Sequence, residues 1–171
     1  MQSISFRATS YFSSFICDYI EENPQLKPFY NRFPTYENFK EQINEKQFSK
    51  SNRVTLVKVL QNQYTAVNTS EKTAKNIALL GKENTFTVTT GHQLNLFTGP
   101  LYFLYKILST INLCEELSFK NPDQNFVPIY WMASEDHDFE EINFFNFKNE
   151  KLQWDRGFGG AVGELSTEGL S

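Results

Sequence analysis

The chain has 171 residues, of which 16 are Lys or Arg and 20 are Asp or Glu, so its formal net charge at pH 7 is −4. With 40% hydrophobic and 21% charged residues, its composition is that of a globular domain rather than a disordered segment. No run of residues approaches the ~18 apolar positions of a membrane helix, and the polar start lacks the order of a signal peptide. We therefore expect a cytoplasmic protein without a membrane partner. An acidic chain also lacks the positive field that nucleic acids require, so no nucleic-acid partner is expected.

Amphipathic patterns predict a helical segment over residues 1–80. Apolar residues recur at spacings of three and four, as on one face of a helix, and Ser, Thr and Asn stand where helices usually begin. Successive helices are expected to begin at Ser10, Thr35, Ser51 or Asn52, and Ser70. The last of them should stop at Gly81, before which the chain has no glycine. The two cysteines, Cys17 and Cys114, lie among apolar residues and are expected to be buried free thiols.

From Thr85 onward the pattern changes to that of an α/β fold. Residues 85–90 read as a strand, 91–99 as a loop, 100–117 as a helix beginning with Pro100 at its first position, and 125–133 as a second, buried strand. This order describes a βαβ unit with a parallel sheet. The helix is apolar nearly all round, so it should be covered on more than one side.

The end of the chain is expected to hold a β-hairpin and a glycine-rich loop. Residues 143–155 alternate across a turn at 148–150 and predict the hairpin. Residues 157–171 read as a loop entering another helix, with a cap near Ser166 or Thr167. The chain therefore divides into a helical segment, 1–80, and the first part of a parallel-sheet core, 81–171.

Polar residues gather in the two loops that follow the predicted strands. In parallel sheets these loops meet at one edge, where ligands bind. The only two histidines, His92 and His137, fall one in each loop, the second among Glu135, Asp136 and Asp138. If the strands are neighbours, both imidazoles should point into one crevice. An Asp–His pair such as Asp136–His137 suits general-base catalysis.

Two other interpretations of these loops stay open. Asp138 and Glu141 fit a helix cap, and Glu140 and Glu141 fit ordinary acids at a helix start. A divalent metal held by His137, Asp136 and His92 is the other possibility, although the spacing matches no specific metal motif.

The loop after the first strand also suits an anion. Gly99–Pro100 opens a helix whose free N–H groups and dipole favour phosphate or carboxylate, unless the glycines serve only to turn the chain. Lys106, the only charged residue between Pro100 and Cys114, could neutralise such an anion or extend to the surface instead. Tyr102 and Asn95 are secondary candidates. The spacing is neither that of a Walker A loop nor GxGxxG.

Three ordered motifs resemble the amino-terminal part of the BshC family, which is assigned to the cysteine-adding step of bacillithiol biosynthesis. They are TTGHQLNLFTGPLYFLYK, VPIYWMASEDHDFEEIN and GGAVG, within residues 85–163. The resemblance implies a Rossmann-like core, similar to that of class I nucleotidyl-transferases, and a carboxy-terminal coiled coil that makes homodimers. It also implies an amide ligase that joins cysteine to glucosaminyl-malate with ATP. The chain would then be an amino-terminal fragment, inactive alone, that holds one wall of an active site.

The resemblance also selects residues. Its first motif covers Gly91, His92, Gln93, Gly99, Pro100 and Tyr102, and its second covers 135–138. Because the family often has Gln at the position of His92, the expected catalytic residues are His137 and Asp136, with Glu135 or Asp136 holding an ammonium group. Lys106 and the Gly99–Pro100 helix start would stabilise anionic oxygens. The rival functions are a metal-dependent hydrolase and a non-catalytic, dimerising α/β protein.

Overall fold

The structure is a computed structural model that describes residues 3–157 and 159–170. Contacts divide the chain into two compact units, Met1–Gln47 and Phe48–Ser171. The predicted division at residue 80, made on composition, stays a prediction. Within the described ranges, none of the helices combines the length and the apolar character needed to cross a membrane.

The first unit is helical, as predicted. It holds α1 (Ser14–Ile20), α2 (Tyr36–Glu45) and two short 3-10 turns, η1 (Arg7–Thr9) and η2 (Pro24–Phe29). Thr35 caps α2 as expected, since its side chain accepts a hydrogen bond from the backbone N–H of Asn38. The expected cap of α1 is wrong: Ser13 fills that place, and Ser10 ends η1 in the left-handed region with φ 52°.

Aromatic rings and ion pairs hold this unit together. Tyr19 packs against Tyr30 and Phe33, with ring centroids 5.5 and 5.2 Å away. Arg7 pairs with Asp18 at 2.8 Å and with Glu21 at 2.7 Å. The hydrogen bond from Arg7 lowers the pKa of the Glu21 carboxyl below its ordinary value.

The second unit begins with two more helices, α3 (Lys50–Gln63) and α4 (Glu71–Leu79), and the 3-10 turn η3 (Tyr64–Ala66) between them. Ser70 caps α4, and Gly81 follows its last residues, both as predicted. Ser49 caps α3, so the expected start at Ser51 or Asn52 is wrong. Each misplaced cap lies two or three residues from another Ser, and the amphipathic pattern does not distinguish such neighbours.

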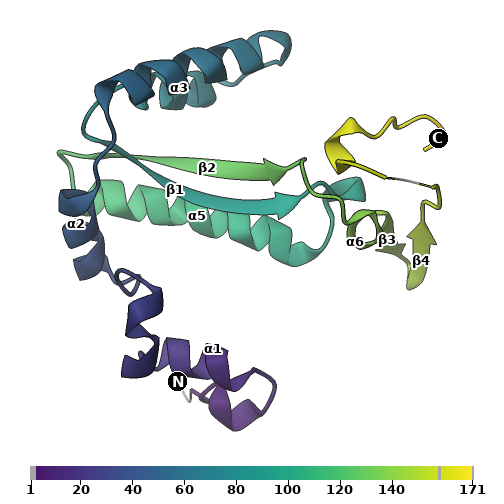
Figure 1. The fold of residues 1–171 in the computed structure, drawn as a ribbon, viewed down its shortest axis with the longest axis horizontal. Coiled ribbons are helices and arrows are strands. Elements are labelled where there is room, and N and C mark those ends of the chain that lie inside the picture. Colours follow the sequence, from purple (N-terminus) through teal and green to yellow (C-terminus); the bar gives the residue numbers. More distant parts are fainter. Residues whose placement is uncertain (1–2, 158, 171) are drawn as a thin grey trace. The chain divides into compact units, whose positions relative to one another are not determined.

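A parallel sheet follows, as predicted. Strand β1 (Thr85–Gln93) pairs with β2 (Asn125–Ala133) from Thr85↔Asn125 to Gln93↔Ala133. Helix α5 (Leu101–Lys120) connects the strands and packs along them (Figure 1). Strand β1 is longer than expected, because residues 91–93 extend the ladder instead of opening the loop. The 3-10 turn η4 (Leu96–Thr98) then leads to Pro100, which is the N-cap of α5 and not its first helical residue.

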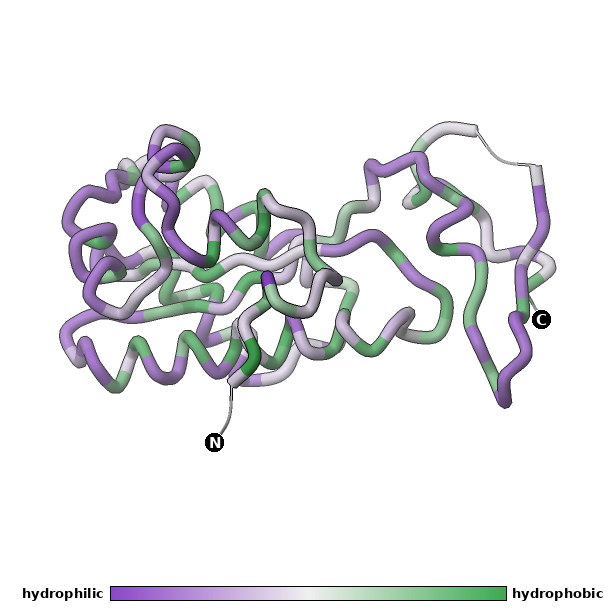
Figure 2. The backbone as a smooth tube through the Cα atoms, turned by 90° about the horizontal axis from the view of Figure 1, so that it is seen from below, coloured by the Kyte–Doolittle hydropathy of each residue, from purple (hydrophilic) through white to green (hydrophobic). Residues whose placement is uncertain are grey.

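Among the described residues of the second unit, helix α5 is covered on one face only. Cys114 and Leu117 are buried against the sheet, and burial raises the pKa of the Cys114 thiol to about 11. Apolar residues recur along the whole helix (Figure 2). Those on the turns facing away from the sheet are exposed: Leu101, Leu104, Tyr105 and Leu108. The described residues of the second unit therefore do not supply the expected cover on a second side.

The end of the chain forms a small apolar cluster. After β2 come α6 (Phe139–Ile142) and the predicted hairpin, β3 (Phe144–Phe147) with β4 (Glu150–Gln153). Its turn residues Lys148 and Asn149 have φ of 49° and 67°. The tail makes a 3-10 turn, η5 (Val162–Glu164), and no helix capped by Ser166 or Thr167 appears up to residue 170; residues 158 and 171 lie outside the described ranges. Phe139, Ile142 and Val162 form the buried centre of this cluster.

A buried arginine ties α3 to the start of β1. Arg53 is 7% exposed, and its guanidinium donates to the carbonyl oxygens of Leu80 and Thr85, both at 3.1 Å, and of Glu83 at 3.2 Å. These carbonyls belong to the turn between α4 and β1. Bonds from a charged donor to buried acceptors are among the stronger hydrogen bonds in proteins. Arg53 therefore fixes the direction in which the chain enters the sheet.

Replacing Arg53 with Met should open this turn, because the carbonyl oxygens lose their donors while the helix keeps an apolar stem of similar length. We expect the free energy of local opening around residues 80–87 to fall by about 2–4 kcal/mol. Hydrogen exchange of the intact protein, followed by mass spectrometry of peptides from this segment, measures it. Lys58→Met, at an exposed position of the same helix, is the control. Equal exchange in both variants would contradict the role of Arg53.

Candidate functional site at the carboxyl edge of the sheet

The two predicted loops lie at the same edge of the sheet, because β1 and β2 are parallel and end in register. A direct bond joins them: the side-chain amide of Gln93 donates to the Glu141 carboxylate at 2.9 Å. Glu141 thus has a role beyond that of an acid at a helix start. The last residue of β1 holds the first turn of α6, and this contact links the two sequence motifs physically.

His92 lies in a set of close polar contacts at the end of β1. Its Nε2 atom is hydrogen-bonded to the Tyr102 hydroxyl, in the first turn of α5. Its Nδ1 atom lies 3.0 Å from the side-chain amino group of Asn95. The ring packs edge-on against Phe103, with centroids 5.9 Å apart. His92 and Tyr102, both predicted site residues, are therefore brought together, and the secondary candidate Asn95 is part of the same group.

Lys106 turns back toward the sheet. Its ammonium group donates to the carbonyl oxygen of Gly91, and the lysine is half-buried. An ammonium group carries three donors, so this contact leaves further N–H groups for other acceptors. The positive charge consequently lies at the base of the loop between β1 and α5, one and a half turns into the helix. Lys106 therefore bonds the end of β1 instead of extending into solvent, and its anion role stays a prediction.

The glycines of the first loop are required by close approach. Gly99 has φ +62°, and a Cβ atom there would lie 2.7 Å from the Asn95 side chain. Gly91 lies against Trp131 of the neighbouring strand, where a Cβ atom would come within 3.0 Å of its carbonyl oxygen. Both positions hold the loop close to the sheet. A larger residue at either would displace the polar contacts around His92.

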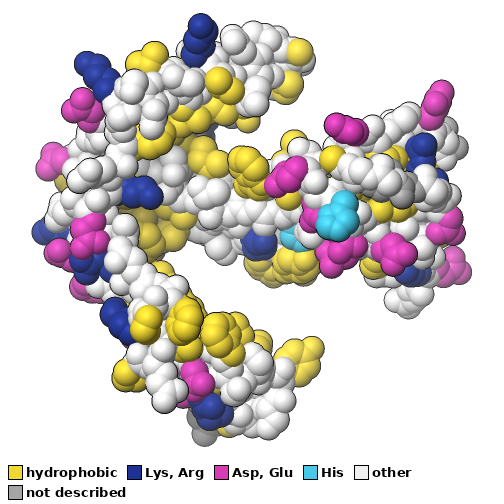
Figure 3. All heavy atoms as spheres, viewed as in Figure 1, with side chains coloured by type: hydrophobic (Ala, Val, Ile, Leu, Met, Phe, Trp, Pro, Cys, Tyr) yellow, Lys and Arg dark blue, Asp and Glu magenta, His cyan; other side chains and the backbone are white. Residues whose placement is uncertain are grey.

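Asp136 and His137 are adjacent but play different parts. One Asp136 oxygen accepts from the backbone N–H groups of His137 at 2.7 Å and of Asp138 at 3.2 Å, which fixes the turn after β2. The same oxygen lies 3.6 Å from His137 Nδ1, which is within ion-pair range but beyond a hydrogen bond. The His137 side chain is 90% exposed. On this face of the molecule a histidine is bordered by acidic side chains (Figure 3).

The other two acids of this loop are not arranged as expected. Glu135 accepts a hydrogen bond from the Trp131 indole at 3.2 Å, so its carboxylate leans back along β2. Asp138 occupies the N-cap position of α6 but its side chain makes no capping bond, and the predicted cap by Asp138 with Glu141 is wrong. In such a cap Glu141 would accept from the backbone N–H of Asp138, but that N–H is bonded to Asp136 and the Glu141 carboxylate to Gln93.

The described residues do not assemble the metal site that the sequence left open as an alternative. Within the described residues, no group of three His, Cys, Asp or Glu side chains is placed to share a metal ion. His92 faces Tyr102 and Asn95, whereas His137 has Asp136 as its close partner and otherwise faces solvent. The expected single crevice with both imidazoles is not formed by these contacts.

The glycine-rich tail packs against residues 134–138, which we call the acidic loop. The sequence alone does not predict this contact. The backbone N–H of Val162 donates to the carbonyl oxygen of Asp136 at 2.7 Å, and that of Gly163 to Ser134 at 2.8 Å. A Cβ atom on Gly163 would lie 2.6 Å from the Ser134 side chain. This approach explains a glycine at position 163. The GGAVG motif indicates that glycine is needed in this segment. It does not identify the residue that Gly163 contacts, Ser134, which lies 29 residues earlier in the chain.

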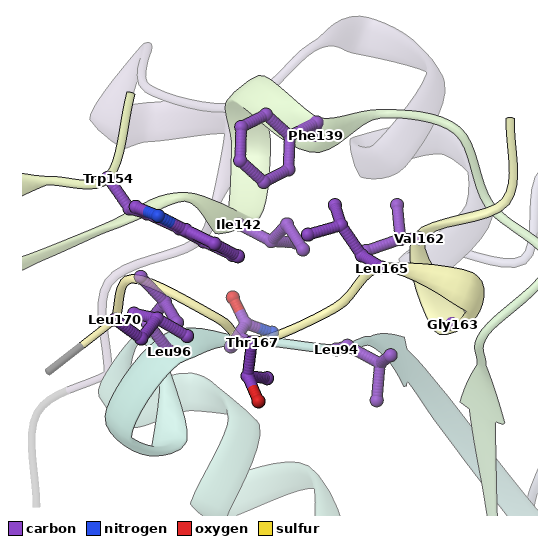
Figure 4. A pocket seen from close by; sticks show the side chains of 11 residues that line it. Leu94, Leu96, Phe139, Ile142, Trp154, Val162, Gly163, Leu165, Thr167 and Leu170 are labelled. Atoms are coloured by element: carbon purple, nitrogen blue, oxygen red, sulfur yellow. The ribbon is translucent and has the colours of Figure 1, made fainter. Parts of the chain in front are cut away.

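An apolar hollow of about 310 Å³ lies beside these loops (Figure 4). Side chains from the loop after β1, from α6, from the segment after β4 and from the tail line it. They are Leu94, Asn95, Leu96, Phe139, Ile142, Trp154, Val162, Leu165, Thr167 and Leu170, together with Gly163. Asn95 thus borders both the hollow and the contacts around His92.

Comparison with known proteins assigns the family. Over residues 1–171 the chain matches the profile described as "Bacillithiol biosynthesis BshC, N-terminal Rossmann-like domain". The chain belongs to the BshC family. It is 59% identical over 170 residues to a protein of Flavobacterium johnsoniae, and 61% over 171 residues to one of Flavobacterium psychrophilum, with 98% of this chain and 32% of each relative covered. A protein of Cytophaga hutchinsonii is 42% identical over 171 residues, with 100% of this chain and 33% of the relative covered.

These three relatives carry the name "Putative cysteine ligase BshC". The chain spans about a third of their length. The description of the BshC domain as Rossmann-like agrees with the parallel pairing of β1 and β2 around α5. The resemblance seen in three short motifs therefore extends over the whole chain.

Gly163→Ala should weaken the contact between the tail and the acidic loop, because the added methyl group overlaps the Ser134 side chain. We expect faster hydrogen exchange in residues 134–138 of the intact protein and a loss of about 1–3 kcal/mol of local stability. Gly157→Ala is the matched control, since nothing lies within 4 Å of a Cβ atom there. Unchanged exchange in the Gly163 variant would mean that the tail does not support the loop.

Proposed function

We propose that the whole enzyme containing this chain forms the amide bond between the carboxyl group of cysteine and the amino group of glucosaminyl-malate. Membership of the BshC family and the printed names of its relatives support a cysteine ligase. The observation in this chain that supports it most directly is the Gln93–Glu141 bond, which brings an anion-suited loop and an acidic loop to one edge of the sheet. Such an enzyme needs both, one for the carboxylate and one for the amine.

The start of α5 suits the anionic partner. The first N–H groups of a helix have no partner within it, and the Tyr102 hydroxyl and the half-buried Lys106 ammonium add a donor and a charge. These groups fit phosphate oxygens of ATP or the carboxylate under activation. ATP would supply the free energy that turns a carboxylate oxygen into a leaving group. The residues of this chain would bind and orient the negative charge.

The acidic loop suits the amine. Glu135 and Asp136 attract an ammonium group, and His137 can take the proton that nitrogen must lose. The bound ammonium group first loses one proton to solvent, which leaves a neutral amine with a lone pair. As the bond from its nitrogen to the carbonyl carbon forms, the bond from that carbon to its activated oxygen breaks, and the second proton passes from nitrogen to His137, which leaves a neutral amide. Because Nδ1 faces Asp136, the exposed Nε2 atom is the acceptor. Asp136 holds the turn that presents this ring.

The fragment forms one wall of the site in this proposal. We expect the enzyme to be a cytoplasmic homodimer assembled through its carboxy-terminal coiled coil, and residues 1–171 to be inactive alone. The chain's share of its relatives' length and the exposed apolar face of α5 support this reading.

A deletion strain tests the reaction. We expect it to accumulate glucosaminyl-malate and to lack bacillithiol, and the full-length gene to restore the thiol. Full-length protein with His137→Ala should restore at most about a hundredth of the rate, since general-base catalysis contributes about 10²–10⁴-fold. Glu140→Gln, on the exposed first turn of α6, is the control. Normal bacillithiol in the deletion strain would refute the proposed reaction, whereas full rescue by the His137 variant would refute only the base.

Lys106→Met in the full-length enzyme should weaken anion binding, because it removes the charge at the base of the loop. We expect KM for ATP or for cysteine to rise about 10- to 100-fold, as for a lost bond between charged groups. Lys106→Arg should recover part of the loss. Lys82→Met, at an exposed position away from the sheet edge, should change neither constant. Unchanged KM values for both substrates in the Met variant would remove Lys106 from the anion site.

A further inference from the structure

Asn95 occupies a position from which one amino group reaches two acceptors. Its Nδ2 atom lies 2.9 Å from the carbonyl oxygen of Gln93 and 3.0 Å from His92 Nδ1. Close packing against Gly99 leaves the side chain little room to move. We propose that Asn95 is a positioning residue, which holds His92 as the Nε2–H tautomer and thereby makes the Tyr102 hydroxyl a donor toward the anion site.

The Gln93 carbonyl fixes which way the Asn95 amide faces. A carbonyl oxygen can only accept, so the group beside it must be the amino group and not the amide oxygen. The amino group has a second hydrogen, and His92 Nδ1 lies at bonding distance from it. A hydrogen bond from this amino group requires a lone pair on Nδ1. In a neutral imidazole the ring proton consequently resides on Nε2.

The tautomer determines the direction of the next hydrogen bond. With its proton on Nε2, His92 donates to the oxygen of Tyr102. The tyrosine then keeps its own hydrogen, which points away from the imidazole. Tyr102 is 52% exposed and stands in the first turn of α5, beside the helix start. Its hydroxyl is thus an oriented donor at the place where the proposed function requires one.

Without Asn95 the direction of the hydrogen bond between His92 and Tyr102 would reverse. His92 Nδ1 also lies 3.2 Å from the Gln93 carbonyl oxygen, so the other tautomer has an acceptor ready for its proton. Nε2 would become an acceptor and would take the hydrogen of Tyr102. The hydroxyl would then face the site with lone pairs only, which repel an anion. Asn95 therefore selects between a donor and an acceptor at Tyr102 without touching the ligand.

Packing holds the ring in the orientation that this role needs. Phe103 lies edge-on to His92 and also to Tyr130, the latter with centroids 5.4 Å apart. The Tyr130 hydroxyl donates to the backbone carbonyl of His92 at 3.3 Å. The imidazole is thus held both through its backbone and through its ring.

The tautomer can be observed directly. In the intact protein labelled with ¹⁵N at histidine, long-range ¹H–¹⁵N spectra distinguish a protonated from an unprotonated ring nitrogen, and His92→Gln assigns the signal. We expect Nε2–H in the native protein and Nδ1–H in Asn95→Asp, whose carboxylate accepts from Nδ1. Asn112→Asp, at an exposed position of α5, should keep Nε2–H. A native His92 in the Nδ1–H form would overturn the inference.

Kinetics test the consequence at Tyr102. The role given to Tyr102 rests on the proposed function. Because either ATP or cysteine could supply the anion, KM is measured for each of them separately. We expect Tyr102→Phe and Asn95→Asp each to raise one of these constants about 10- to 100-fold, and the double variant to be no worse than Tyr102→Phe alone. Independent, additive losses, or no rise in either KM, would overturn it. A native enzyme without ligase activity would refute the proposed function while leaving the tautomer assignment intact.

Discussion

Parallel pairing of β1 with β2 is the constraint on which the site depends. Side chains of a strand alternate between faces, so a slip of one residue would exchange every contact. In the observed register Gly91 lies opposite Trp131 and Gln93 opposite Ala133, at the very end of the ladder. Both loops therefore leave the sheet at the same level. The connection through α5 is long enough to make the strands parallel, and burial of Leu117 and Val127 between helix and sheet stabilises that arrangement.

Around this edge, much of the organisation comes from bonds between side chains and backbone. Lys106 binds the Gly91 carbonyl, Asn95 binds that of Gln93, and Asp136 binds the N–H groups that follow it. Backbone groups at the ends of strands have lost their ladder partners and must be satisfied in another way. The same residues that satisfy them carry charge or orient a ring. Structure and proposed chemistry are thus served by one set of contacts.

The sequence predicts local elements well and contacts between distant segments poorly. The βαβ order, the hairpin and the helical first segment follow from periodicity, which is a property of neighbouring residues. The sequence alone presents Glu141 as an ordinary acid at a helix start, because its partner Gln93 lies 48 residues earlier. For the same reason it gives no sign that Gly163 supports Ser134. The predicted cap Ser10 is wrong for a different reason: Ser10 and Ser13 are chemically equal, and only the path of the chain selects Ser13.

The exposed face of α5 bears on how strongly the proposed anion site can act. Leu101 and Tyr105 flank Tyr102 on the helix surface and are 66% and 62% exposed. A donor beside solvent competes with water for its ligand, whereas the same donor under an apolar cover acts in a lower dielectric and binds charge more tightly. The apolar strip on α5 provides a surface for such a cover. The groups of this chain can therefore specify the geometry of the site while its strength depends on what lies over Leu101 and Tyr105.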